Sequence, residues 1–342
     1  TRPETAAGRT LFNNTGPYQF GLFINKDNLL IQGVNDAGVP ITDPAATAAY
    51  VTTNATNSFG TSGFFVEGNG VTITGLKVGP NAAGDNKTIE VIGDNFTLKY
   101  SRIAVPDGGS VYLNDWRYNA TSNVSYVQAY TIEGNLFEQG SSLDISSGAG
   151  YSGPPSGRLI KNNKFTLGPG QYWPAISFNG IVPSVGWFTY SVGGAVITGN
   201  DFSGGEQYIR ARGIYDNSQF NWQSYWNDNT FDRKAVALAN AGTFDVRPYS
   251  YTSGSYFIDN ARRIGGLVQP QIDIASAGDT VLVGKGQYAE NLAIGKHIKL
   301  IGAGSAAGNT VIHPPSGDSF VVTGSGESNS NPLLIKDVRV ET

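Results

Sequence analysis

The sequence predicts an all-β protein built as a right-handed parallel β-helix, with the start of a second β-helix at the C-terminus. Two observations lead to this fold class: a short strand-bend-strand pattern that recurs along the chain, and a composition rich in turn-forming and β-forming residues. Gly accounts for 45 of the 342 residues, charged residues for 15% and apolar residues for 39%. This apolar content is sufficient to fill a core, and the abundance of Gly argues against long helices.

The recurring pattern reads apolar, x, Ile or Leu, x, Gly or Asn, x, x, apolar. A period of two on either side of the Gly or Asn indicates two strands joined by a bend, and these two residue types tolerate the left-handed conformation that a bend requires. Copies recur at intervals of roughly 30 residues with variable insertions, which is typical of a solenoid. The central residues, which we expect to stack in the interior, are Ile73, Leu98, Ile132, Ile160 and Ile197, with Trp226 at the equivalent core position of a partial sixth copy.

Asparagine recurs at the bends, and a second apolar strand precedes each copy. If successive coils stack, Asn135, Asn163, Asn200 and Asn229 form an internal ladder in which each amide bonds to the next coil. The preceding strands include Phe64 to Val66 and Leu143 to Ile145. Because parallel strands without helical connections require stacked coils, these features together predict a solenoid.

Residues 268–312 differ from the preceding repeats because they begin with an amphipathic segment, Val268 to Ala275, and continue into short apolar strands. This segment resembles the opening of the pectate-lyase-like right-handed parallel β-helix superfamily, and the resemblance implies a short capping helix followed by a first coil. We therefore predict one β-helix lacking its N-terminal cap over residues 1–262. Residues 263–342 are then the capping helix and first coils of a second β-helix, or the permuted N-terminal part of a single one.

Composition also narrows the expected partners and location. The formal net charge is −4, so no basic surface for nucleic acid is expected. No apolar run approaches the roughly 20 residues of a membrane span, so no membrane insertion is expected. There is no Cys, and the only histidines are His297 and His313, which excludes histidine-based catalysis and zinc sites from residues 1–296. We expect a part of a larger secreted or cell-surface parent protein, of bacterial type.

Aromatic residues gather in the insertions between the second strand and the repeat copy. Stacked coils would bring these insertions to one edge, which we call the rim. Aromatic side chains stack on the apolar faces of sugar rings, and loops on a rigid scaffold commonly carry binding sites. The residues expected to bind substrate there are Trp116, Arg117, Tyr118, Tyr151, Trp173, Trp187, Tyr190, Tyr215 and Trp222.

Charged residues beside the rim provide an alternative, enzymatic interpretation. The candidates are Arg210, Arg212, Asp144 and Asp115. The resemblance implies a lyase arrangement, in which calcium held by carboxylates acidifies a proton that a basic side chain removes. Two carboxylates could equally serve a glycoside hydrolase. No cofactor is required by either pattern, Ca²⁺ is a candidate ligand, and no metal-binding residues are identified.

Three hypotheses follow. The first is a binding module that holds polysaccharide or a cell-surface glycan along the rim, as an adhesin would. The second is a polysaccharide lyase or glycoside hydrolase acting in the same groove, and the third is a structural spacer. A binding module predicts exposed rings, a spacer predicts the same rings buried, and an enzyme predicts a carboxylate pair or an Arg beside a cation site.

Overall fold

The computed structural model describes residues 22–46, 50–51, 64–79, 87–104, 110–114, 129–146, 157–179, 193–212, 217–239, 244–306, 308–324 and 332–341. The chain forms two compact units. Unit 1 comprises residues 1–168, 175–201 and 213–221, and unit 2 comprises residues 169–174, 202–212 and 222–342. Residues 222–262, assigned above to the end of the first β-helix, thus belong to the same unit as residues 263–342. The division into tandem β-helices stays a prediction.

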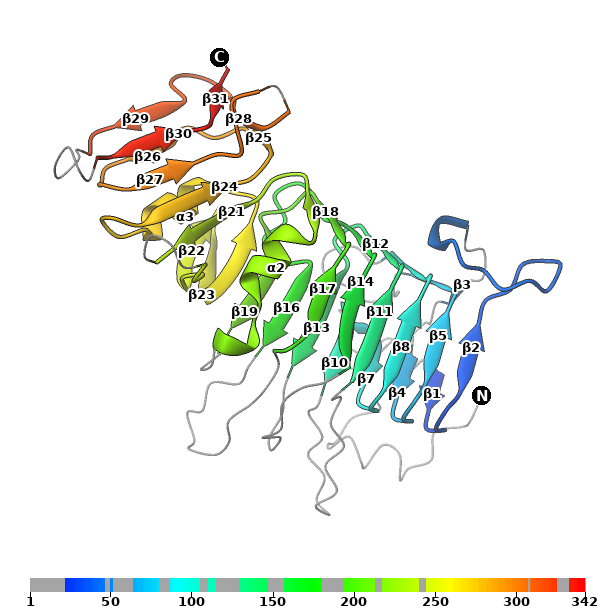
Figure 1. Ribbon diagram of the computed structural model, residues 1–342. Coiled ribbons are helices and arrows are strands. Elements are labelled where there is room, and N and C mark those ends of the chain that lie inside the picture. Colours follow the sequence, from blue (N-terminus) through cyan, green and yellow to red (C-terminus); the bar gives the residue numbers. More distant parts are fainter. Residues whose placement is uncertain are drawn as a thin grey trace, which may run out of the picture. The chain divides into compact units, whose positions relative to one another are not determined.

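Unit 1 is a parallel β-helix of three sheets, as the sequence predicts (Figure 1). The first sheet contains, in spatial order, β1 (Leu22–Ile24), β4 (Phe64–Val66), β7 (Lys87–Val91), β10 (Ser110–Asn114), β13 (Ser142–Ser146) and β16 (Ile176–Asn179). The second contains β2 (Leu30–Gln32), β5 (Thr72–Thr74), β8 (Phe96–Lys99), β11 (Tyr130–Glu133), β14 (Arg158–Lys161) and β17 (Val196–Thr198). The third contains β3 (Tyr50–Val51), β6 (Lys77–Val78), β9 (Arg102–Ala104), β12 (Leu136–Glu138) and β15 (Lys164–Thr166). Single 3₁₀ turns lie at Pro44–Ala46 and Asn217–Gln219.

The interior of unit 1 is filled by files of residues that occupy the same position in successive coils. The predicted file is confirmed, because each of its members is the register partner of the next, and all are buried: Ile73, Leu98, Ile132, Ile160 and Ile197. A second file in the third sheet includes Phe137 and Phe165, whose rings stack with centroids 4.5 Å apart. Each such buried side chain contributes about 1.5–3 kcal/mol through the hydrophobic effect.

The predicted asparagine ladder is confirmed for three of its members. The backbone N–H and side-chain Nδ2 of Asn135 both donate to Asn163 Oδ1 at 2.9 Å, and Asn163 bonds to Asn200 Oδ1 in the same way. Ser101 extends the ladder, since its N–H donates to Asn135 Oδ1 at 2.9 Å. Asn229 lies in unit 2, where its Nδ2 donates to the Tyr225 carbonyl.

The bends before the ladder residues adopt the left-handed conformation that the sequence predicts. The residues with positive φ there are Gly134 (65°), Asn162 (56°) and Gly199 (66°), and Tyr100 has the same conformation before Ser101 (φ 50°). Gly and Asn enter this region at low cost, whereas a tyrosine is strained. The bend turns the chain from the second sheet into the third and directs the amide inward.

Unit 2 mixes parallel and antiparallel pairing. Its main sheet has the order β19 (Gln207–Arg212), β23 (Tyr256–Gly265), β21 (Ala235–Leu238), β24 (Thr280–Val283), β27 (Lys299–Ile301) and β30 (Leu334–Lys336). The pairings of β23 with β19 and β21, and of β21 with β24, are antiparallel, whereas β24, β27 and β30 are parallel. The strand β22 (Tyr249–Ser253) forms a hairpin with β23. The sequence did not predict this hairpin.

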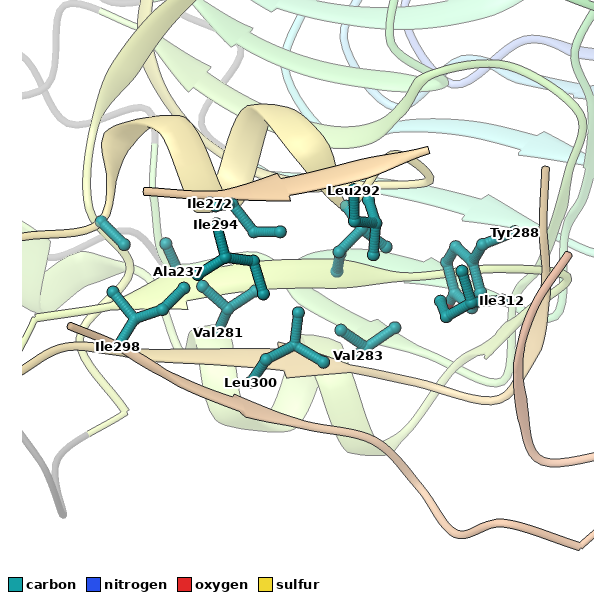
Figure 2. Packing of buried hydrophobic residues seen from close by; sticks show 13 residues of the cluster. Ala237, Ile272, Val281, Val283, Tyr288, Leu292, Ile294, Ile298, Leu300 and Ile312 are labelled. Carbon is teal, nitrogen blue, oxygen red and sulfur yellow. The ribbon is translucent and has the colours of Figure 1, made fainter. Parts of the chain in front are cut away.

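The C-terminal part of unit 2 begins with the helix α3 (Gln269–Ile274), where the sequence predicts a helix. Its capping role stays a prediction. Short parallel strands follow in two further sheets: β25 (Gly286–Tyr288), β28 (Thr310–Ile312) and β31 (Arg339–Val340), and β26 (Leu292–Ile294) with β29 (Phe320–Val322). Figure 2 shows how Ile272 from α3 packs with Val281, Ile294 and Leu300 in one buried cluster. The helix therefore contributes to this core.

One core assignment from the sequence is wrong. Trp226 was expected at an inward strand position, but it lies in the short helix α2 (Trp222–Asn227) and is partly exposed. The second half of that repeat copy does form a strand, β20 (Thr230–Phe231), beside which lies β18 (Asp201–Ser203). Within the described residues, no helix has the length and hydropathy needed to cross a membrane.

Candidate functional site

Five of the residues predicted to form the site lie in the described part of the chain. They are Asp144, Trp173, Arg210, Arg212 and Trp222. Asp144 is on β13 in unit 1, and the other four belong to unit 2. The remaining predicted site residues lie outside the described residues: Asp115, Trp116, Arg117, Tyr118, Tyr151, Trp187, Tyr190 and Tyr215.

Two of the described candidates, Trp222 and Asp144, pack against or bond to other side chains of the protein. The side chain of Trp222 is only 2% exposed and packs edge-on against Tyr225, with ring centroids 5.8 Å apart. A ring buried in this way presents no face to a ligand. Asp144 is half-buried on β13, where its Oδ2 accepts a hydrogen bond from Ser142 Oγ at 3.3 Å.

Arg210, on the strand β19, contacts Trp173. Arg210 and Arg212 lie two residues apart and so on the same face of this strand. Arg210 is buried (4% exposed), whereas Arg212 is exposed at the end of the strand. The Arg210 guanidinium carbon lies 5.8 Å from the centroid of the Trp173 ring, within the range of a cation–π contact. Trp173 itself is 45% exposed.

Trp173 is part of a group of three aromatic residues that we call the aromatic stack: Tyr172, Trp173 and Tyr256. Tyr172 is the central member, with its ring centroid 4.5 Å from that of Tyr256 at an interplanar angle of 23° and 5.4 Å from that of Trp173 at 33°. The outer members are the exposed ones, since Tyr256 is 55% exposed. The stack thus leaves two large rings accessible to solvent.

Hydrogen bonds of Glu206 and Gln207, at the start of β19, hold the two segments that carry the aromatic stack. These segments are the one containing Tyr172 and the hairpin of β22 and β23. The N–H of Glu206 donates to the Gln171 carbonyl at 2.8 Å, and buried Gln207 donates through Nε2 to the Tyr172 carbonyl. The carboxylate of Glu206 accepts from Tyr251 Oη at 3.2 Å and Ser253 Oγ at 2.6 Å, which fixes the hairpin that presents Tyr256. The position of the exposed rings is therefore set by a rigid strand.

One group that holds the hairpin in place, the hydroxyl of Tyr251, has a shifted pKa. Burial, the neighbouring Tyr249 and the Glu206 carboxylate all raise the pKa of Tyr251 well above its usual range, so its hydroxyl stays a hydrogen-bond donor. No group of three or more His, Cys, Asp or Glu residues that could hold a metal ion occurs among the described residues. The arrangement offers flat apolar surfaces, and the exposed Arg212 lies two residues beyond Arg210 on β19. Such surfaces suit binding by stacking.

Sequence reasoning missed Tyr256 because it missed the hairpin. The signal was present: Tyr249-Ser-Tyr251-Thr-Ser253 alternates large and small residues, and Gly254-Ser255 follows as a two-residue turn. Such alternation around a Gly-containing turn is typical of a β-hairpin, and Gly254 has a φ of 57°.

Comparison of the chain with family models, with curated proteins and with solved structures gives no match.

Proposed function

We propose that this chain is a carbohydrate-binding β-helix segment that holds a polysaccharide or cell-surface glycan on its aromatic residues. The observation that carries the proposal is the aromatic stack, in which Trp173 and Tyr256 remain exposed although both are large and apolar in part. Sugar rings present apolar C–H faces that pack on aromatic rings, while hydroxyl groups bond to neighbouring polar side chains. Arg212, exposed at the end of β19, could supply such bonds.

The exposure of the rings favours binding over the spacer hypothesis. A spacer would bury its loop aromatics against the β-helix, as Trp222 is buried. The anchoring of the stack through Glu206 and Gln207 adds support, because a ligand site on a rigid element loses less entropy when it binds. The enzymatic alternative has Arg210 or Arg212 acting beside Asp144 or Asp115, with or without Ca²⁺. Among the residues that the structure describes, no comparable observation favours it.

The proposal also concerns the superfamily to which the fold is related and the place where the protein acts. The capping helix α3 followed by short parallel strands supports a relation to the pectate-lyase-like right-handed β-helix superfamily. We propose that the chain belongs to a larger secreted or cell-surface protein, where tandem β-helices would hold the binding surface away from the cell. An extended, rigid solenoid suits this task because its length grows by adding coils.

A glycan array followed by calorimetry on the best ligand tests the proposal. The Trp173→Ala and Tyr256→Ala variants should each bind the selected glycan roughly tenfold more weakly, the loss expected for one stacked ring. Trp173→Phe should retain most of the affinity because a flat ring remains. Val321→Ala, which trims an exposed side chain on β29, is the matched control and should bind like the parent chain.

Two results would contradict the proposal. If no glycan binds, or if Trp173→Ala and Tyr256→Ala leave binding unchanged, the aromatic stack is not the site. An activity screen on acidic and neutral polysaccharides, with and without Ca²⁺, runs in parallel. Release of unsaturated or reducing ends that Arg212→Ala abolishes would favour the enzyme over the binding module.

A further inference from the structure

A cleft of about 440 Å³ lies in unit 2, away from the residues of the aromatic stack. Its apolar wall includes Leu282 on β24 and Ile301 on β27, which are register partners and half-buried. Their neighbours Val281 and Leu300 point into the core, so Leu282 and Ile301 lie on the opposite face of the sheet. The volume lies within the range of small-molecule sites.

Lys234 occupies a fixed position in this cleft. Its Nζ lies 4.4 Å from the centroid of the Trp226 ring and 4.8 Å from that of Phe231, and it donates to the Trp226 carbonyl. Its aliphatic stem packs on Gly284, where an added Cβ would come within 2.4 Å of Lys234 Cγ. The backbone is held as well, since Lys234 N–H donates to Tyr288 Oη at 2.9 Å. The ammonium group is therefore positioned before any ligand arrives.

The charge of the cleft is positive. The described residues that line it include Lys234 and exposed Lys285 and contain no carboxylate, although the whole chain has a net charge of −4. Burial lowers the pKa of Lys234 to about 8, because desolvation disfavours the charged ammonium form. An anion placed beside Nζ would favour the charged form.

The glycine-rich turns beside the cleft do not offer backbone donors to an anion. The N–H groups of Gly284, Gly302 and Gly304 donate to the carbonyls of Lys234, Lys336 and Asp337 at 2.7–2.9 Å. Phosphate sites typically use several such N–H groups, whereas a carboxylate is satisfied by one or two ammonium groups. The lysines are thus the donors to any anion here, and the apolar wall selects what the anion is attached to.

We propose that this cleft binds a small organic monocarboxylate with a compact apolar body. The carboxylate lies between Lys234 and Lys285, and the apolar body packs on Leu282 and Ile301. The site is separate from the aromatic stack, and its existence does not depend on glycan binding.

Calorimetric titration of the whole chain with benzoate tests this proposal, with benzamide as the neutral analogue and phenyl phosphate as the phosphate analogue. Benzoate should bind at least tenfold more tightly than benzamide, because only the anion compensates Lys234. Equal affinities would overturn the proposal. Tighter binding of phenyl phosphate would overturn the assignment to a carboxylate.

Variants locate the site. Lys234→Met keeps the length of the apolar stem and should weaken benzoate binding at least tenfold, while Lys285→Met, at an exposed position, should weaken it severalfold. Lys299→Met changes a lysine outside the lining and should bind like the parent chain. Unchanged affinity in both lining variants would overturn the proposal. If Lys234→Met folds poorly, unchanged affinity in Lys285→Met alone would overturn it.

The pH dependence gives a second readout. Charged and titratable groups near Lys234 are Lys285, Arg233, Asp232 and Tyr288, and burial raises the pKa of Tyr288 above its usual range. Benzoate affinity should fall as the pH rises through about 8, where Lys234 loses its proton. The fall should be absent from the residual binding of Lys234→Met. A fall that persists in this variant would assign the titration to another group and contradict the role of Lys234.

Discussion

The interiors of the two units satisfy buried polar groups in different ways. In unit 1, neutral amides repeat from coil to coil, so that Asn135 bonds to Asn163 and Asn163 bonds to Asn200. In unit 2, buried polar groups are individual: the guanidinium of Arg263 donates to the Tyr249 carbonyl at 2.7 Å and lies 4.4 Å from the Tyr249 ring centroid. In a repeat, each amide can bond to the same residue of the next coil. In a segment that occurs once, such as the hairpin of β22 and β23, each buried polar group needs a different kind of partner.

This difference predicts how far the effect of a mutation extends. A ladder residue has partners in the coils on both sides, so its loss affects three coils. A single buried cation has partners in one hairpin, so its loss should remain local. The following variants test this contrast.

The largest effect is expected for Asn163→Ala. The change removes the acceptor of the Asn135 backbone N–H and one of the two acceptors of Asn135 Nδ2. It also removes the bond from Asn163 Nδ2 to the Ile132 carbonyl. We expect a loss of about 3–4 kcal/mol in the free energy of unfolding of unit 1, from unsatisfied buried donors and lost packing. Urea denaturation measures the loss, and hydrogen exchange should show faster opening of the coils containing Asn135 and Asn200.

The control for this prediction is Lys164→Ala, which changes the exposed neighbour of Asn163. It should alter the free energy of unfolding by less than about 0.5 kcal/mol. If Asn163→Ala is no more destabilising than this control, the ladder does not hold the coils together.

A smaller, local effect is expected for Arg263→Met in unit 2. The change removes a charge-assisted bond to the Tyr249 carbonyl and the cation–π contacts with Tyr249 and Tyr251, which together contribute about 2–3 kcal/mol. Hydrogen exchange should increase in β22 and β23 and stay unchanged in the ladder coils. The neighbouring Arg262→Met, which loses one bond to the Val246 carbonyl from a half-buried position, should have a clearly smaller effect. Equal effects would show that burial of Arg263 has no special role.

The contrast between the units also explains what could be predicted from the sequence. The file from Ile73 to Ile197 and the ladder were predictable because each is repeated, and a repeated pattern has only one consistent register in a stack of coils. The helix α3 was expected only because Val268 to Ala275 resemble the opening segment of a β-helix superfamily, which implies a helix there. The hairpin of β22 and β23 occurs once and pairs antiparallel, so no repeat indicated it.

The candidate site was less predictable for the same reason. Trp173 was identified by its residue type. Tyr256 lies in the same group only because of the hairpin, which is held by hydrogen bonds from Tyr251 and Ser253 to Glu206, about 45 residues away in the sequence. Trp222 and Trp226 are close in sequence, yet one is buried and the other lines a cleft, because a helix turn replaces the expected strand there. Residue type alone does not distinguish such neighbours.

A further comparison of the units uses two glycines in the same backbone conformation. Gly75→Ala in unit 1 should cost about 2 kcal/mol, because φ is 67° and the new Cβ would lie 2.6 Å from the backbone carbonyl oxygen of Ile41 in the preceding coil. Gly170→Ala in unit 2 has a φ of 70° and no atom within 4 Å of the new Cβ, so it should cost only the backbone strain of about 1 kcal/mol. Thermal or urea unfolding of both variants measures the difference. Equal costs would show that stacking between coils adds nothing to the strain.

The smallest effect concerns the surface of unit 1, where the repeat also aligns charges. Glu133 on β11 bonds to Lys99 on β8 and to Lys161 on β14, both at 2.9 Å. Burial alone would raise the pKa of Glu133, but the hydrogen bonds and charges of Lys161 and Lys99 outweigh it and lower the pKa. Stability from the ionised carboxylate is therefore present above its unfolded pKa of about 4.3 and is lost as the pH falls through the lowered folded value.

Glu133→Gln should accordingly destabilise unit 1 at neutral pH by less than about 1 kcal/mol, because the three side chains are partly exposed and screened by water and salt. The difference from the parent chain should shrink in high salt and disappear at acidic pH, where the parent loses the same charge. Glu341→Gln, which affects the exposed pair of Arg339 and Glu341 in unit 2, should show no measurable loss. A difference that persists unchanged at acidic pH would mean that the glutamate stabilises the coils by packing and not by its charge. In that case the aligned charges would add no stability to that of the ladder and the apolar files.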